Sequence, residues 1–190
     1  NPSGYALHYG TPMNVSADEM TVEIEAEVEL DVTNVAYGKS AYQVSTAYGG
    51  EPSRAVDGNG KQHWNHGSCT HTGWTYNPWW YANLGGPHRV DSVMIFDRAD
   101  YGRLHRGDGA IVGVSNHECW EDGDCETHVN VTVCLTITSE DEVDNGQYMG
   151  DCAEGTIGKY LFVYIRGSNY YMNFAEVIAM GLEMANGTTP

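Results

Sequence analysis

The clearest alternation of hydrophobic and polar positions lies near the start of the chain, in TVEIEAEVELDV at residues 21–32. Apolar residues there alternate with glutamate or aspartate, and successive side chains of a β-strand point to opposite faces. The stretch therefore predicts a strand with one buried and one solvated face. Its row of carboxylates could bind calcium, but an exposed acidic face that discourages edge-to-edge aggregation is the simpler interpretation.

Further apolar runs of strand length follow, separated by segments rich in Gly, Asn, Asp and Pro. Several short strands joined by long turn-rich loops predict an all-β protein with a β-sandwich of jelly-roll type. Residues 1–33 are predicted to be an N-terminal extension, 34–184 the domain and 185–190 a C-terminal tail. The predicted strands are WWYANL (79–84), RVDSVMIFD (89–97), GAIVGVS (109–115), VNVTVCLTI (129–137), KYLFVYIRG (159–167) and NFAEVIAMGLE (173–183).

Composition agrees with this fold class and narrows the partners. The 190 residues include 23 Gly, 13 Tyr and 5 Trp, a mixture typical of β-domains with many turns. A formal net charge of −17, with only 9 Lys and Arg, argues against nucleic acid and makes anionic membranes poor partners. No apolar run approaches the roughly 20 residues of a membrane-spanning helix, so we expect no membrane insertion.

Sequons and cysteines together predict a secreted glycoprotein. The chain begins NPSGYALHYG, which fits a processed N-terminus, and N-x-S/T acceptor sequences begin at Asn14, Asn130 and Asn186. Two disulfides and one leftover thiol are the simplest arrangement of five cysteines that form no C-x-x-C pair. Each of two pairs brackets an acidic loop, which leaves the fifth cysteine single: Cys119 with Cys125, Cys134 with Cys152, and Cys69 alone.

Enzymatic signals are weak. The chain contains no G-x-S-x-G elbow, P-loop, HExxH or dinucleotide fingerprint. Cys69 and His71 could form a thiol–imidazole pair, but nothing further supports catalysis. Carboxylates are abundant, yet no stretch places one in an apolar, aromatic setting that would raise its pKa for a glycosidase reaction. We therefore expect a protein that is not an enzyme.

Two polar segments are candidates for binding. In RAVDGNGKQHWNHGSCTHT, the oxygens of Asp57, Asn59 and Ser68 suit calcium, although the same composition also fits an ordinary Asx-turn. In DRADYGRLHRGDGA, residues 97–110, three of the scarce arginines fall within nine residues. This second segment is either a loop held by salt bridges or a site that binds a polar ligand.

The spacing of these segments carries a resemblance. His71 is followed after 26 residues by Arg98, then by Asp100 and a basic residue, amid the blocks AVDGN, GSCTHT, NPWW, ANLG, GKYLFVYI and AEV. From Asn34 to Glu183 the chain resembles the F-type (fucose-binding) lectin family, whose motif is His, 26 residues, Arg-x-Asp, four residues, and Arg or Lys. The resemblance implies a jelly-roll sandwich with a shallow sugar pocket at one end.

The resemblance also implies roles for individual residues in binding α-L-fucose. His71 and Arg98 would hydrogen-bond the sugar, Asp100 would hold Arg98, and Trp64 would pack against the fucose methyl group. Strict counting places His105 at the last motif position, whereas one inserted residue brings Arg106 there, and we favour Arg106. The family's two adjacent cysteines are replaced here by Tyr101 and Gly102, and Tyr101 could supply the stacking surface instead.

A structural calcium ion and a disulfide pattern follow from the same resemblance. Cys134–Cys152 would match one family bridge, while Ala175 replaces the usual partner of Cys69, and Cys119–Cys125 would lie in a loop peculiar to this chain. The implied calcium ligands are the side chains of Asp57, Ser68 and Glu176 and the carbonyls of Arg54, Asn59 and Ala175.

The resulting hypothesis is a secreted, calcium-containing lectin for fucosylated glycans or glycoproteins, acting in cell recognition through a His/Arg/Arg clamp. The alternative is a structural or protein-binding module that kept the sandwich while its sugar pocket drifted. Shallow sugar sites gain avidity when several copies are presented together, so the hypothesis includes a homo-oligomer or assembly through the N-terminal strand.

Overall fold

The computed structural model describes residues 31–100, 107–118, 131–138, 140, 142–167 and 169–184. Several predictions lie outside these residues: nearly all of the acidic strand at 21–32, the C-terminal tail, the sequons at Asn14, Asn130 and Asn186, and the Cys119–Cys125 bridge. Within the described part there is no helix with the length and apolarity needed to cross a membrane.

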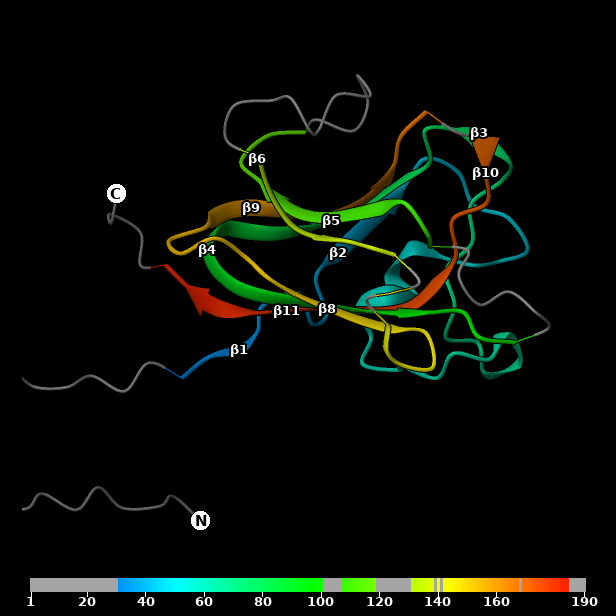
Figure 1. Ribbon diagram of the computed structural model, residues 1–190, viewed down its shortest axis with the longest axis horizontal. Coiled ribbons are helices and arrows are strands. Elements are labelled where there is room, and N and C mark those ends of the chain that lie inside the picture. Colours follow the sequence, from blue (N-terminus) through cyan, green and yellow to red (C-terminus); the bar gives the residue numbers. More distant parts are fainter. Residues whose placement is uncertain are drawn as a thin grey trace, which may run out of the picture.

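The described residues form eleven strands and two short 3-10 helices, arranged as two layers of antiparallel sheet (Figure 1), which confirms the all-β sandwich. The strands are β1 (Thr33–Asn34), β2 (Ser40–Gln43), β3 (Thr75–Tyr76), β4 (Trp79–Asp97), β5 (Ala110–Ser115), β6 (Val131–Thr136), β7 (Glu142–Asp144), β8 (Gln147–Asp151), β9 (Ile157–Ile165), β10 (Asn169–Tyr170) and β11 (Phe174–Glu183), and the 3-10 helices are η1 (Pro52–Val56) and η2 (Trp64–His66).

The long strand β4 belongs to both layers. Its first part pairs with β2 and β9, and its second part pairs with β11 and β8. The register shifts between Asn83 and His88, where Gly85 has a φ of 89°. Glycine adopts this left-handed conformation without a Cβ clash, so the chain turns the corner there without ending the strand. The two strands predicted at 79–84 and 89–97 are therefore one bent strand.

The main core fills the space between the layers. Alternate residues of β4, β5, β9 and β11 point inward, which buries one side of each strand. The sequence of β9 is apolar at consecutive positions because both faces of the strand are buried. On the face away from the main core, Phe162 and Tyr164 pack with Ile111 in a second cluster. The largest inward side chains include Trp80, Leu84, Val90, Ile95, Leu161 and Val163.

The segment 141–158 was predicted to be a turn-rich loop, but it contains the hairpin β7–β8. Asn145 and Gly146 lie between the two strands with φ angles of 26° and 78°. An Asn-Gly pair with positive φ angles is a common hairpin turn. The acidic residues around it hid the strands, and only Tyr148 of β8 is completely buried.

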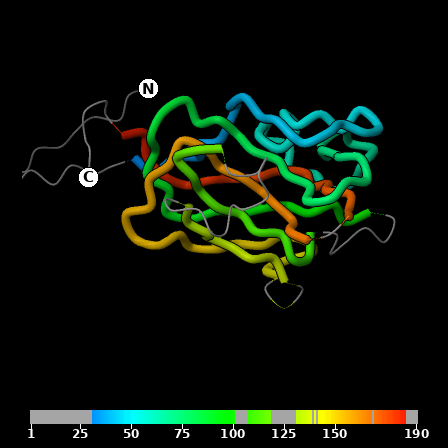
Figure 2. The backbone as a smooth tube through the Cα atoms, turned by 90° about the horizontal axis from the view of Figure 1, so that it is seen from above, coloured from blue at the N-terminus to red at the C-terminus, as the bar shows by residue number. Residues whose placement is uncertain are grey.

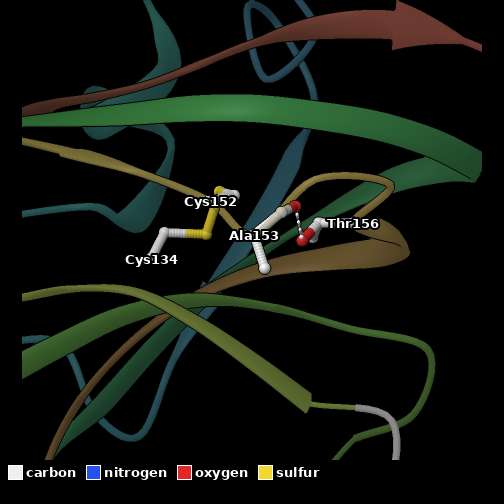
Figure 3. Close-up of a disulfide and its surroundings, with 4 residues drawn as sticks. All are labelled: Cys134, Cys152, Ala153 and Thr156. Atoms are coloured by element: carbon white, nitrogen blue, oxygen red, sulfur yellow. Dashed lines mark hydrogen bonds between the residues drawn. A yellow bond between two sulfur atoms is a disulfide. The ribbon is translucent and has the colours of Figure 1, made fainter.

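The disulfide predicted between Cys134 and Cys152 is present and joins β6 to the residue after β8 (Figure 3). Strand β6 is the edge of one layer, and β8 lies near the edge of the other. The bridge therefore ties the two layers together along one side. Cys69 is free, as predicted, and it is buried.

The two ends of the sandwich have different roles. At one end β1 pairs with β11, so the described chain enters and leaves side by side (Figures 1 and 2). At the other end lie the long segment between β2 and β4, the end of β4 and the β10–β11 link. These three segments carry the described candidate site residues.

Candidate functional site

His71 lies at this loop-bearing end with its side chain buried. Its Nδ1 is 2.6 Å from the carbonyl oxygen of Thr72. A carbonyl can only accept, so Nδ1 carries the proton of the neutral ring, and Nε2 is then the acceptor nitrogen. His71 is thus prepared to accept a hydrogen bond from a hydroxyl group.

The backbone of His71 is held by the segment that follows β2. Its amide donates to Gly50, and its carbonyl accepts from Ala47 at 2.9 Å. The Gln43 amide donates to the carbonyls of both Gly50 and His71. A Cβ at Gly50 would lie 2.4 Å from the His71 nitrogen, so only glycine allows this close approach. Gln43 and Gly50 are supporting residues that the sequence reasoning missed.

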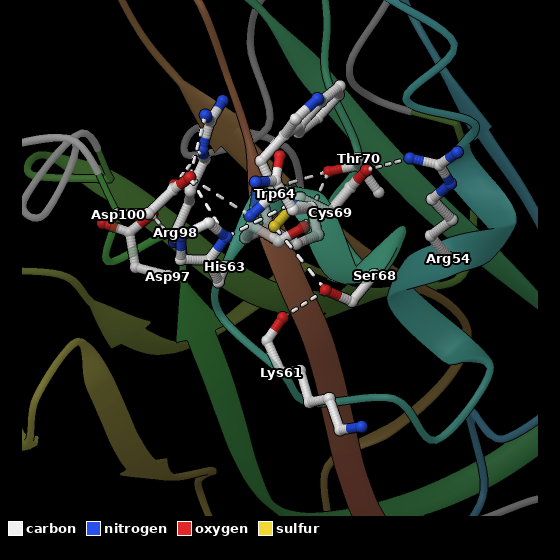
Figure 4. A network of polar contacts seen from close by, with 12 residues as sticks. Arg54, Lys61, His63, Trp64, Ser68, Cys69, Thr70, Asp97, Arg98 and Asp100 are labelled. Carbon is white, nitrogen blue, oxygen red and sulfur yellow. Dashed lines mark hydrogen bonds and ion pairs between the residues drawn. The ribbon is translucent and has the colours of Figure 1, made fainter.

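Arg98 and Asp100 form a buried two-point ion pair just beyond the end of β4 (Figure 4). Nε of Arg98 donates to Oδ1 of Asp100, and Nη2 donates to Oδ2 at 3.3 Å. Burial alone would raise the pKa of Asp100, but the hydrogen bond and charge of Arg98 outweigh it and lower the pKa. The pairing fixes the plane of the guanidinium group, as the sequence predicted for Asp100.

Trp64 connects the two arms of the site. Its indole lies edge-on to His71, with ring centroids 5.6 Å apart, and the guanidinium carbon of Arg98 lies 4.8 Å from the indole centroid. Its amide also donates to Asp100 at 3.3 Å. The structure therefore brings together the four described residues predicted for sugar binding.

Two tyrosines that the sequence reasoning did not single out flank His71. The rings of Tyr48 and Tyr171 lie 5.1 Å and 5.5 Å from the imidazole, both edge-on. Tyr48 is 78% exposed and has a φ of 54°. This left-handed conformation is rare for a bulky residue and is typical of functional loops. Neither tyrosine lies in a recognisable local motif, so only the fold could reveal them.

Asp97 is a further supporting residue that sequence reasoning missed. Its buried carboxylate accepts from the amides of Arg98 and Gly107, which are the two ends of the segment that follows β4. It therefore holds both ends of this segment in place. Tyr101, Gly102, Arg103, His105 and Arg106, which occupy the middle of the segment, lie outside the described residues.

A shallow hollow adjoins the Arg98–Asp100 pair. Its volume is about 340 Å³, and Asp100 forms part of its wall. Asp100 is also 3.7 Å from the ring of His63, which lies 5.4 Å from the ring of His66. The remaining lining residues are Lys61, Gln62, Ala99 and Asn145.

Two of the side chains predicted to bind calcium, Asp57 and Glu176, lie near each other where the loop after η1 approaches strand β11. The amide of Gly58 lies 3.2 Å from both carboxylate oxygens of Glu176, and the Asn59 amide donates to Asp57. Burial raises the pKa of Glu176 to about 7, and the nearby negative charge of Asp57 adds to the rise, against the Gly58 hydrogen bond. The sequence did not reveal this raised pKa, because Glu176 becomes buried only when the chain folds.

The same region constrains Ser68, Arg54 and Cys69. Ser68 is fully buried and its hydroxyl donates to the carbonyl of Lys61, while Arg54 donates to the carbonyl of Cys69 at 3.1 Å (Figure 4). Burial raises the pKa of the Cys69 thiol, which keeps it protonated and unreactive. In the described part of the chain no three His, Cys, Asp or Glu side chains gather around a metal position. A cation here would therefore need backbone carbonyls besides its two carboxylates.

The chain was compared with known protein families and structures. The model of the NedA-like, galactose-binding domain family matches residues 54–163, more than half of the chain. Fucolectin-5 of Anguilla japonica is 30% identical over 159 residues, which cover 80% of this chain and 78% of that protein. The chain covers less of other relatives, such as 65% of fucolectin-6 from the same eel, which is 32% identical over 70% of this chain.

Solved structures agree. The f-lectin from the serum of striped bass (Morone saxatilis) superposes with a TM-score of 0.69 at 29% identity, over 80% of this chain and 48% of that one. The lectin domain of lectinolysin, solved in complex with the Lewis B antigen, superposes with a TM-score of 0.64 at 28% identity, over 77% of this chain and 95% of that one. With its all-β sandwich and its His71 and Arg-x-Asp arrangement, the chain belongs to the F-type lectin family.

Proposed function

We propose that this chain is a secreted lectin domain that binds glycans bearing α-L-fucose. The observation that carries the proposal is the buried pairing of Arg98 with Asp100 beside His71, across Trp64. A buried guanidinium is held in one orientation at one end of the sandwich, next to an imidazole with a defined acceptor nitrogen. Such an arrangement suits a neutral ligand with several hydroxyl groups in fixed directions.

The chemistry of recognition follows from hydrogen-bonding capacity. Arg98 is only a donor, so its N–H groups that face away from Asp100 bind the oxygens of neighbouring hydroxyls. His71 accepts through Nε2, so it binds the hydrogen of a hydroxyl. The edge of Trp64 adds apolar surface for the fucose methyl group. The proposed third cation, Arg106 with His105 as the alternative, and the stacking role of Tyr101 stay predictions.

The proposal includes a structural calcium ion held by the region around Glu176. Asp57 and Glu176 supply carboxylates, Ser68 a hydroxyl, and Arg54, Asn59 and Ala175 carbonyls, and such oxygen donors are the ligands that calcium prefers. A carboxylate whose pKa is raised by burial and, to a smaller extent, by a second carboxylate fits a cation, because the cation would compensate the buried charge and the repulsion. The ion would link the loop that leads to His71 with strand β11.

The proposed setting is extracellular. A disulfide between Cys134 and Cys152 persists in oxidising compartments, and the three N-x-S/T sequences agree with passage through the secretory pathway. The names of the similar proteins, fucolectin and a lectin domain with the Lewis B antigen, support a fucosylated glycan as the partner.

Calorimetric titration with L-fucose in calcium-containing buffer tests the proposal. We expect binding by the wild-type protein and at least a tenfold loss, about 1.4 kcal/mol or more, for His71→Ala and Arg98→Ala, which each remove one arm. Arg89→Ala is the matched control, because Arg89 forms a partly exposed Arg-x-Asp pair elsewhere on β4. A correctly folded wild-type protein that binds no fucose at millimolar sugar would support the alternative, a module that kept the sandwich without its sugar site.

A further inference from the structure

Three aromatic side chains continue outward from His71. We call Trp74, Tyr170 and Tyr171 the aromatic platform. The ring of Tyr171 contacts the imidazole at 5.5 Å on one side and the indole of Trp74 at 5.0 Å on the other, and Tyr170 lies 6.3 Å from Trp74 at an interplanar angle of 38°. An unbroken chain of ring contacts therefore leads from the proposed fucose site to Trp74.

The platform is held by backbone pairing on both sides. Strand β3 pairs with β10, and Thr75 lies opposite Tyr170. On the other side of Trp74, the Thr72 amide donates to the carbonyl of Met172, and the Met172 amide donates to the Thr72 hydroxyl, both at 2.9 Å. Trp74 and Tyr171 thus lie between two sets of hydrogen bonds that join the segment 72–76 to the segment 169–172.

Core packing does not explain Trp74, although Tyr170 is half-buried and packs against the main core. Trp74 is 59% exposed, although tryptophan is largely buried in most proteins. An exposed indole supported by two half-buried rings, in contact with His71 through Tyr171, is typical of a binding surface.

The ligand that fits the platform is small. Three side chains provide far less than the roughly 800 Å² per partner of a stable protein interface. A second copy of the chain would also bring together two bodies of net charge −17. A neutral sugar meets neither obstacle.

We propose that Trp74, supported by Tyr171, forms a second sugar subsite that binds the pyranose linked to fucose in a fucosylated oligosaccharide. The assignment rests on the proposed function, because the neighbouring sugar is defined by the fucose bound at His71. One face of a pyranose presents C–H groups, and these pack against the electron-rich face of an indole. The hydroxyl of Tyr170 or Tyr171 and the indole N–H can then meet the hydroxyl groups at the rim of the sugar.

Calorimetry with two classes of ligand tests the subsite. The ligands are L-fucose and a panel of fucose-terminated tri- and tetrasaccharides that includes the Lewis B antigen, each monovalent. For Trp74→Ala we expect an unchanged Kd for L-fucose and a Kd roughly threefold to tenfold weaker for at least one oligosaccharide that the wild-type protein prefers over fucose. Trp74→Tyr, which keeps a ring, should recover most of the preference.

Controls separate the subsite from general damage. Tyr42→Ala removes another half-exposed ring with its own stacking partner, Tyr81, on the outer face of the sandwich, and it should change neither Kd. Thermal unfolding of each variant reports whether the fold is intact. The tryptophan fluorescence of the wild-type protein should shift more with the preferred oligosaccharide than with L-fucose, and Trp74→Tyr should lose this difference.

The outcomes are distinct. Fucose binding with the same oligosaccharide-to-fucose ratio in wild-type protein and Trp74→Ala overturns the subsite alone. Equal losses for both ligands mean that Trp74 acts through His71 as a structural residue, which also overturns it. Binding of neither ligand by the wild-type protein contradicts the proposed function and the subsite together. Self-association in sedimentation that disappears in Trp74→Ala would reassign the platform to a protein contact.

Discussion

The buried pair of Arg98 and Asp100 allows the most direct test of how the site is built. The perturbation is Asp100→Asn, which keeps the size of the side chain and removes its charge. The two side chains are only 10% and 2% exposed, so water cannot replace the lost carboxylate. The guanidinium of Arg98 would remain buried without its counter-charge.

The expected magnitude follows from this burial. Breaking a buried ion pair by removing one partner costs about 3–5 kcal/mol. Asparagine keeps one acceptor oxygen, so we expect the lower end, about 3 kcal/mol of unfolding free energy. For a domain of this size, that corresponds to a decrease in Tm of roughly 6–12 °C. Fucose binding should weaken at least tenfold, because the guanidinium is no longer held in one plane.

A second Arg-x-Asp pair, which lies within β4 itself, provides the control. Arg89 and Asp91 are also two residues apart and 2.9 Å from each other, but their side chains are 34% and 42% exposed. Asp91→Asn should therefore cost less than about 1 kcal/mol. Urea unfolding of the three proteins measures the difference, and equal costs for the two variants would refute the reasoning from burial.

The pH dependence gives the same test a second readout. The pKa of Asp100 is lower in the folded chain than in the unfolded chain. Its contribution to stability is then fully present above the unfolded pKa and is lost as the pH falls through the folded pKa. The stability difference between wild-type protein and Asp100→Asn should therefore be constant near neutral pH and should shrink below about pH 4. A difference that persists unchanged at pH 2 would contradict the assignment.

Three further predictions concern the surroundings of the site. Gly50→Ala should abolish fucose binding in titrations, because the new Cβ would lie 2.4 Å from the backbone nitrogen of His71. Gly67→Ala is the control for backbone strain, because a Cβ at Gly67 meets open space while the backbone there has a positive φ. Without calcium, the pKa of Glu176 is raised from 4.5 to about 7 by folding. Between these two pH values the folded state therefore keeps a proton that the unfolded state has released. Stability should then fall by up to about 3 kcal/mol as the pH rises from 4.5 past 7, and calcium or Glu176→Gln should remove this loss in thermal melts. Replacing Cys134 and Cys152 together with serine should lower the free energy of unfolding by about 3 kcal/mol in urea titrations, since the bridge closes a loop of 18 residues.

Local patterns along the chain predicted most of the sheet. Strands β5, β6, β9 and β11 lie within a few residues of their predicted bounds, because apolar runs between turn residues are a local signal. Two features were missed: the bend that makes β4 one strand, and the β7–β8 hairpin. Gly85 was interpreted as the end of a strand although pairing continues on both sides, and Asn145–Gly146 was interpreted as a loop because acidic residues surround it.

The residues of the candidate site likewise fall into those that the sequence predicted and those that only the fold revealed. The spacing of His71, Arg98 and Asp100 is a property of the sequence, and it led to the family and to the pairing of Arg98 with Asp100. The tyrosines around His71 and the glycine beneath it carry no such spacing. Tyr171 reaches the imidazole only because the β10–β11 link runs back alongside the segment from Thr70 to Thr72.

By itself, the sequence determined the all-β class, the approximate positions of β5, β6, β9 and β11, the free Cys69 and the grouping of His71, Arg98 and Asp100, since each depends on neighbours along the chain or on a fixed spacing. Only the tertiary structure decided what surrounds the clamp. Glu176 meets Gly58 across 118 residues, and Trp74 meets Tyr171 through the pairing of β3 with β10. The physical reason is that antiparallel pairing and loop packing bring together distant segments, and no local periodicity records such contacts.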